Sequence, residues 1–250
     1  MVSSSAPTTD RLPRSVAGLL LAGLFARLAL AVIVEPGLDE AYAIAVANLR
    51  QLSWFDHPPM TFWWVAAMRA LATPVYGVDV PAVVLRLPFV LAFTGTSWAL
   101  YDLTRRLWGC RAGWWALLAL TLAPFFLVSA GSWLVPDGPL LLFLALAGRT
   151  LAILLFADPS PAEARRRWLT LGLVLGLAGL SKYHAALLAA AALAFVVATR
   201  HPRRLARPWP AVLDREAAGE HAACRLHRTR TAAGALCAYA PARDGRLLLQ

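Results

Sequence analysis

The sequence predicts an all-α fold, a polytopic bundle of about six transmembrane helices. Three observations support this prediction. The chain of 250 residues is 59% hydrophobic and only 15% charged, whereas a soluble domain carries about 25% charged residues. The apolar residues fall in blocks of about 20, which is the length that one helix needs to cross a bilayer. Arginines separate these blocks, as in membrane proteins whose cytoplasmic loops are positively charged.

The net charge of +10 does not predict a nucleic-acid partner, because the arginines alternate with apolar blocks. The cysteines include no C-x-x-C pair, so they predict neither a metal site nor a disulfide framework. They are Cys110, Cys224 and Cys237. The partner that the composition does predict is the membrane.

The N-terminus is predicted to be a cytoplasmic segment followed by a retained helix. Residues 1–14 are polar and carry two arginines, and residues 15–34 form the first apolar block. This block lacks a small-residue cleavage site, so we expect a first span that also acts as signal. Arg27 inside it would be costly at the centre of a bilayer and is expected to face the protein or reach the interface.

The first outer loop, residues 35–80, is predicted to hold two interfacial helices. The first covers residues 39–52 and the second covers residues 60–71, which are rich in Trp and Phe and suit the lipid interface. A break at residues 54–59 separates the two helices. The periodicity of the first helix predicts an amphipathic helix with Ala41, Ala45 and Leu49 on one face.

Five further membrane helices follow, the last two as a hairpin. Three are predicted at residues 81–103, 112–130 and 139–156. Residues 168–199 would form a single helix about 48 Å long, which exceeds a hydrocarbon core of about 30 Å. Arginines flank both of its ends, so we expect a helical hairpin whose tip, residues 181–184, reaches the far side.

This topology places three segments outside the cytoplasm, at residues 35–80, 131–138 and 181–184. These segments gather most of the ionisable residues that could do chemistry, namely Asp39, Glu40, Asp56, His57, Asp137, Lys182 and His184. That one-sided distribution is the main functional signal in the sequence.

The domain boundaries follow from the apolar blocks. Residues 1–14 are the cytoplasmic N-terminus, residues 15–205 the transmembrane domain, and residues 206–250 a basic tail without an apolar block. Two interpretations of the tail are open. It is either the product of a shifted reading frame or a disordered basic cytoplasmic segment.

Two motifs in the first outer loop carry candidate chemistry. Asp39 and Glu40 are adjacent carboxylates, and either could act as a general base toward an acceptor hydroxyl or bind a divalent ion. The alternative is that Asp39 caps the helix and Glu40 favours its dipole. Asp56 and His57 precede two prolines that stiffen the loop. They suit contact with a metal or a phosphate, or they mark only a turn.

The remaining candidates lie near the other two outer segments. Lys182, with Tyr183 and His184, could bind a phosphate as a point charge supported by hydrogen bonds, or anchor the hairpin at the interface. Arg86, at the outer end of the second span, could meet an anion or reach the interface. Asp137 is a candidate helix N-cap.

In their order along the chain, these motifs resemble the N-terminal half of the C-type membrane glycosyltransferases that use polyprenyl-phosphate sugars. The similarity covers about residues 15–205. It is to the protein O-mannosyltransferase and aminoarabinose-transferase kind, family 39 of the glycosyltransferases. The motifs are D-E-A-Y at 39–42, D-H-P-P at 56–59, R-L-P at 86–88, P-D-G-P at 136–139 and G-L-S-K-Y at 179–183. Each motif is weakly specific, and their order and spacing carry the resemblance.

The resemblance implies roles for the site residues. Asp39, with Glu40 beside it, would be the catalytic carboxylate that deprotonates or orients the acceptor. The motif at residues 56–59 would bind the lipid phosphate or a metal. Lys182 and Arg86 would offset the charge on the departing phosphate.

The resemblance also implies partners and a location. The donor would be a polyprenyl-phosphate sugar and the acceptor a lipid, glycan or protein. The only cofactor that the resemblance implies is a divalent metal ion. The location would be a bacterial inner membrane with the active face outside the cytoplasm. Family members usually continue for several more spans and an outer domain, so we expect a truncated and inactive form if the tail is not native.

Two other classes of function compete with an enzyme. A secondary transporter would place charges near the bilayer midplane and often shows internal repeats. Residues 15–103 and 112–200 show no such repeat, and the charges gather at one surface instead. A non-catalytic membrane scaffold would tolerate replacement of Asp39.

Overall fold

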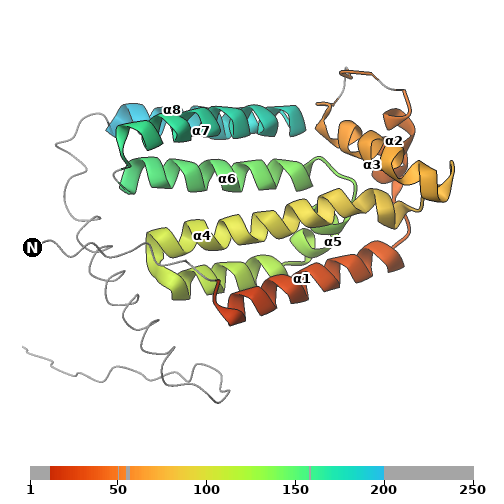
Figure 1. The fold of residues 1–250 in the computed structure, drawn as a ribbon, viewed down its shortest axis with the longest axis horizontal. Coiled ribbons are helices and arrows are strands. Elements are labelled where there is room, and N and C mark those ends of the chain that lie inside the picture. The colour runs from red at the N-terminus through yellow and green to blue at the C-terminus, as the bar shows by residue number, and fades with distance from the viewer. Residues whose placement is uncertain (1–11, 50, 55–56, 158, 200–250) are drawn as a thin grey trace, which may run out of the picture.

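A computed structural model describes residues 12–49, 51–54, 57–157 and 159–199, and all regular secondary structure in these ranges is helical (Figure 1). This confirms the all-α prediction. The helices are α1 (Arg14–Ile33), α2 (Leu38–Ala47), α3 (Met60–Tyr76), α4 (Ala82–Leu122), α5 (Pro124–Ser132), α6 (Asp137–Phe156), α7 (Pro161–Ser181) and α8 (Ala185–Thr199). The predicted tail, residues 206–250, lies outside the described residues.

Three of the described helices are long and apolar enough to cross a membrane, namely α1, α4 and α6. The bounds of α1 and α6 agree with the predicted first and fourth spans to within about two residues. The total of about six spans remains a prediction.

Helix α4 is a hairpin of two limbs rather than one long rod. Gly109 has φ 87° and ψ 168°, a conformation that only glycine adopts without strain. The chain therefore reverses there, and Figure 1 shows the second limb running back beside the first. A Cβ atom at Gly113 would lie 3.0 Å from the carbonyl oxygen of Tyr101, so the two limbs pack closely.

The predicted third span, residues 112–130, is divided in the structure. The second limb of α4 ends at Leu122, and α5 begins at Pro124. Ala123 between them is extended, with ψ 119°. The cause is Pro124, which lacks a backbone N–H and disfavours helical geometry in the residue before it.

The predicted helical hairpin is present. Helix α7 ends at Ser181 and α8 begins at Ala185, with Lys182 extended between them at φ −159° and ψ 139°. Helix α7 begins at Pro161, earlier than expected. Its N-cap, Ser160, accepts a hydrogen bond from the backbone N–H of Glu163, a common helix start.

Arg27 faces the protein, as one of the two sequence-based alternatives predicted. Its side chain is 1% exposed, and its Cζ lies 4.5 Å from the ring centre of Phe93. A Cβ atom at Gly131 would lie 2.7 Å from Nε of Arg27. Glycine at this position therefore lets α5 approach α1 closely.

The helices alternate in direction, so that several chain reversals meet at one end of the bundle. In Figure 1 this end holds α2, α3, the end of α1, the starts of α4 and α6, and the turn between α7 and α8. We call it the reactive end. It unites the three segments that the sequence predicts on one side of the membrane.

Candidate functional site

A buried ion pair organises the reactive end. Nε of Arg86 donates to Oε1 of Glu40 at 2.8 Å, and Nη2 donates to Oε2 at 2.5 Å. Arg86 is 1% exposed and Glu40 is 0% exposed. Such a two-point contact between guanidinium and carboxylate fixes orientation as well as distance.

The same pair joins four segments of the chain. Nη1 of Arg86 donates to the carbonyl oxygens of Ala31 and Val34, both at 2.7 Å. These carbonyls lie at the C-terminal end of α1 and at its C-cap, where the last carbonyl oxygens of a helix lack N–H partners in the next turn. Oε1 of Glu40 also accepts from the backbone N–H of Leu134 at 3.0 Å. The pair therefore holds α1, α2, α4 and the loop before α6 together.

This pairing decides which face of α2 is buried. The buried residues are Glu40, Ala43 and Ala47, whereas the predicted face of Ala41, Ala45 and Leu49 is exposed. Those three residues share one side, as predicted, and that side is the exposed one. In the sequence Glu40 looks like a surface residue, but its ion pair with Arg86 turns its side of α2 toward the protein.

Asp39 is exposed on the first turn of α2. Gly37 is the N-cap of this helix, so the alternative that Asp39 caps it was wrong. Instead, the backbone N–H of Gly37 donates to Oε2 of Glu40 at 3.3 Å. Of the two adjacent carboxylates, Glu40 is thus held by internal contacts and Asp39 is exposed.

The structure brings the first two motifs together through aromatic rings. Tyr42 lies one turn after Asp39, so both side chains share one side of α2. The rings of Tyr42 and His57 are 5.9 Å apart, and both approach Phe62 at the start of α3. The sequence named Tyr42 only as part of the D-E-A-Y motif, and the structure places its ring beside those of His57 and Phe62. Asp56 lies outside the described residues.

The other candidates meet in a second ion pair. Nζ of Lys182 donates to Oδ1 of Asp137 at 2.8 Å, and both side chains are about a third exposed. The N-cap of α6 is Pro136, and Asp137 is the first residue of the helix. The prediction of Asp137 as the N-cap was therefore wrong by one position. Tyr183 and His184 are exposed beside Lys182 in the turn before α8.

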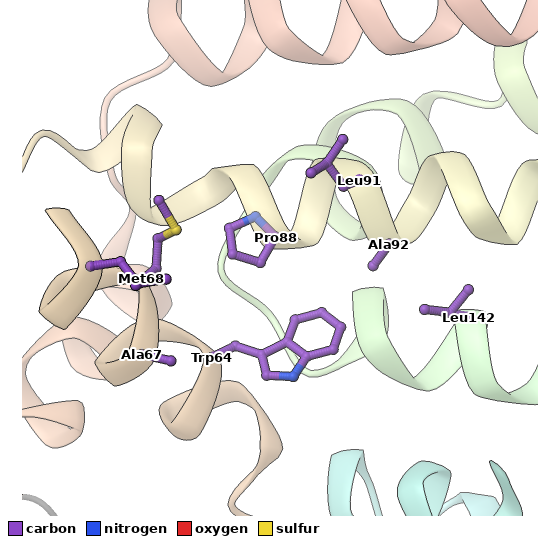
Figure 2. Close-up of a pocket in the computed structure, with 8 residues that line it drawn as sticks. Trp64, Ala67, Met68, Pro88, Leu91, Ala92 and Leu142 are labelled. Carbon is purple, nitrogen blue, oxygen red and sulfur yellow. The ribbon is translucent and has the colours of Figure 1, made fainter.

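An apolar pocket of about 390 Å³ lies between α3, α4 and α6. Figure 2 shows Trp64 extending from α3 toward Ala92 and Leu142. The lining of the pocket is almost wholly hydrocarbon and consists of Trp64, Ala67, Met68, Leu71, Pro88, Leu91, Ala92 and Leu142. A pocket of this composition suits an aliphatic chain rather than a sugar.

No three side chains of His, Cys, Asp or Glu gather as metal ligands within the ranges that the structure describes. The described carboxylates and imidazoles of the reactive end do not form a metal centre by themselves. The divalent ion remains a prediction without an assigned ligand set.

The model of the family described as dolichyl-phosphate-mannose-protein mannosyltransferase matches residues 56–214. The matched region contains His57, Arg86, Asp137 and Lys182, while Asp39 and Glu40 precede it. No curated protein and no solved structure matches the chain.

Proposed function

The chain belongs to the dolichyl-phosphate-mannose-protein mannosyltransferase family, and we propose that it transfers a sugar from a polyprenyl-phosphate donor to an acceptor at its reactive end. The family and the apolar helices make it a multi-pass membrane protein of the glycosyltransferase class. The observation that carries the proposal is the contrast between two adjacent carboxylates. Asp39 is exposed, whereas Glu40 is buried and held by its ion pair with Arg86.

In the proposed reaction, Asp39 acts as the base. Its carboxylate accepts the proton of an acceptor hydroxyl, and the hydroxyl oxygen forms a bond to the anomeric carbon of the sugar. The bond from that carbon to the phosphate oxygen breaks, and the phosphate oxygen keeps the electron pair. A positioned carboxylate of this kind contributes roughly 10²- to 10⁴-fold to a rate.

Lys182 is the proposed cation for the departing phosphate. It is part-exposed, and its ion pair with Asp137 holds the ammonium at the reactive end. Positive charge placed where negative charge develops lowers the barrier more than it stabilises the bound donor. Tyr183 and His184 follow Lys182 in the turn before α8 and are proposed to contact the donor. His57 is proposed to contact it as well.

Arg86 and Glu40 are proposed as positioning residues. Within the described part of the chain, Arg86 donates four hydrogen bonds, all of them to protein groups, so a phosphate would have to break a buried pair to reach it. The pair instead fixes the first turn of α2 and with it the place of Asp39.

The apolar pocket is the proposed seat of the donor's isoprenoid chain. It lies between three helices of the bundle, and hydrocarbon there would replace contacts with lipid tails. The acceptor (a lipid, a glycan or a protein) and a divalent ion are further proposals. So is a location in a bacterial inner membrane with the reactive end outside the cytoplasm.

The test is sugar transfer from a radiolabelled polyprenyl-phosphate donor in membranes that contain the full chain or its Asp39→Asn variant. We expect Asp39→Asn to lower the transfer rate by roughly 10²- to 10⁴-fold. Asp79→Asn is a matched control, because Asp79 is an exposed carboxylate in the loop that leads into α4, and we expect it to keep full activity.

Three results would count against this proposal. Equal activity of Asp39→Asn and the unchanged chain would remove Asp39 from the chemistry. Equal loss in both variants would point to a general effect of charge. Absence of transfer by a chain shown to be inserted would favour a non-catalytic membrane scaffold.

A further inference from the structure

A second polar cluster lies inside the bundle, away from the reactive end. Asp102 on the first limb of α4 is 2% exposed. Its carboxylate accepts hydrogen bonds from Nε of three arginines, at 2.7, 2.7 and 2.5 Å. We call the group the Asp102 cluster; its other members are Arg105, Arg106 and Arg149.

The cluster carries more positive than negative charge. Three guanidinium groups surround one carboxylate, which leaves a formal excess of two positive charges. Among the residues that the structure describes, the terminal nitrogens of Arg106 and Arg149 have no hydrogen-bond partner, because each donates to Asp102 only through Nε. Unused guanidinium nitrogens beside an excess of charge are suited to a phosphate group.

The cluster is open to the side of the bundle. The side chains of Arg105, Arg149 and Arg106 are 18%, 22% and 36% exposed. The guanidinium of Arg149 also lies 5.1 Å from the ring centre of Trp98, whose side chain is 37% exposed. Tryptophan is enriched where the bilayer meets water, so the surroundings of the cluster match those of lipid headgroups.

The depth of the cluster along α4 also favours a position near the lipid headgroups. The first limb of α4 starts at the reactive end and runs to the opposite end, where it turns at Gly109 (Figure 1). Asp102 lies seven residues before that turn, or about 10 Å along the helix. A net charge at this depth is costly in hydrocarbon unless an anion or the headgroup region compensates it.

We propose that the Asp102 cluster binds the phosphate of an anionic membrane lipid at the end of the bundle opposite the reactive end. Asp102 orients the three guanidinium groups, and the terminal nitrogens of Arg106 and Arg149 donate to the lipid phosphate, while Arg105 adds positive charge beside it. The proposed sugar transfer does not depend on this site, because it lies at the other end of the first limb of α4.

The test uses the full chain purified in a neutral detergent. Thermal unfolding is followed with added dioctanoyl phosphatidylglycerol, dioctanoyl phosphatidylcholine or inorganic phosphate, and native mass spectrometry counts the bound lipid. We expect phosphatidylglycerol to raise the unfolding temperature and the other two additives to have little effect. The rise should shrink as salt increases.

The variant Arg105→Gln/Arg106→Gln should remove most of this response. It leaves Asp102 paired with Arg149, so the cluster becomes neutral without a bare buried charge. We expect phosphatidylglycerol binding to weaken by roughly fivefold for each arginine removed. If the double variant does not fold, Arg106→Gln alone should show a single fivefold step, and Arg106→Lys should restore much of the binding.

The matched control is Arg165→Gln/Arg166→Gln. Both arginines are exposed on the first turns of α7, which begins where α6 ends, so the control removes the same charge near the same end of the bundle. It should leave the response unchanged. An equal response to phosphatidylcholine, or an equal loss in the control, would overturn the site. Stabilisation by inorganic phosphate and not by phosphatidylglycerol would show that the bound phosphate does not come from a lipid.

Discussion

Glu40 shows how one residue can have opposite meanings in a sequence and in a fold. In the sequence it is half of an acidic pair next to an apolar block. In the structure it is fully buried and accepts hydrogen bonds from Arg86, Gly37 and Leu134. Its neighbour Asp39 is exposed on the first turn of α2.

At the residue scale, this contrast gives a stability prediction. Glu40→Ala should destabilise the protein by about 3–5 kcal/mol, because it leaves the charge of Arg86 buried without its partner. Thermal unfolding in detergent measures the effect, with Asp39→Ala as the matched control. Asp39→Ala should change stability by less than about 0.5 kcal/mol.

A double-mutant cycle separates the pair from its two members. Glu40→Leu/Arg86→Leu should cost much less than the sum of the single changes, since no charge is left unpaired. Additive costs would mean that the two side chains stabilise the fold independently, contrary to the geometry.

At the scale of elements, glycines set how closely α5 approaches α1. A methyl group at Gly131 would overlap the carbonyl oxygen of Phe126 and lie 2.7 Å from Nε of Arg27. Gly131→Ala should therefore lower the free energy of unfolding by about 1–3 kcal/mol, the usual cost of overpacking. Thermal unfolding in detergent measures the effect as a lower unfolding temperature.

The control for this prediction lies in α7. A Cβ atom at Gly172 would meet nothing within 4 Å, and alanine is the better helix former by about 1 kcal/mol. Gly172→Ala should leave stability unchanged or raise it. If both variants behaved alike, close packing of α5 on α1 would not be the reason for the glycine.

At the scale of the whole molecule, the two ends of the bundle should face opposite sides of the membrane. We expect Tyr183→Cys, in the exposed turn of the reactive end, to react with an impermeant maleimide added to intact cells. Arg166→Cys, near the start of α7, should react only after the cells are opened. The three native cysteines are first changed to alanine.

This labelling experiment also decides the direction of insertion. Reaction of both positions from the same side would contradict the alternating arrangement of the helices. Reaction of Arg166→Cys alone in intact cells would keep the fold but reverse its orientation, and the proposed active face would then be cytoplasmic.

The sequence by itself determined the elements whose causes are local. Apolar blocks predict the helices, and the block at residues 168–199, which is too long for one span and has arginines at both ends, predicts the turn between α7 and α8. The order of short motifs was sufficient to indicate the family that the comparison confirms. These features depend on neighbours in the chain, so a linear pattern contains them.

Only the tertiary structure decided which polar residues are partners. Glu40 meets Arg86 across 46 positions and Leu134 across 94, and Asp102 meets Arg149 across 47. The buried face of α2 follows from the first of these contacts. A charged side chain has the same helical position whether it faces solvent or a buried counter-charge. The distinction is therefore set by the three-dimensional packing of the helices and is absent from local periodicity.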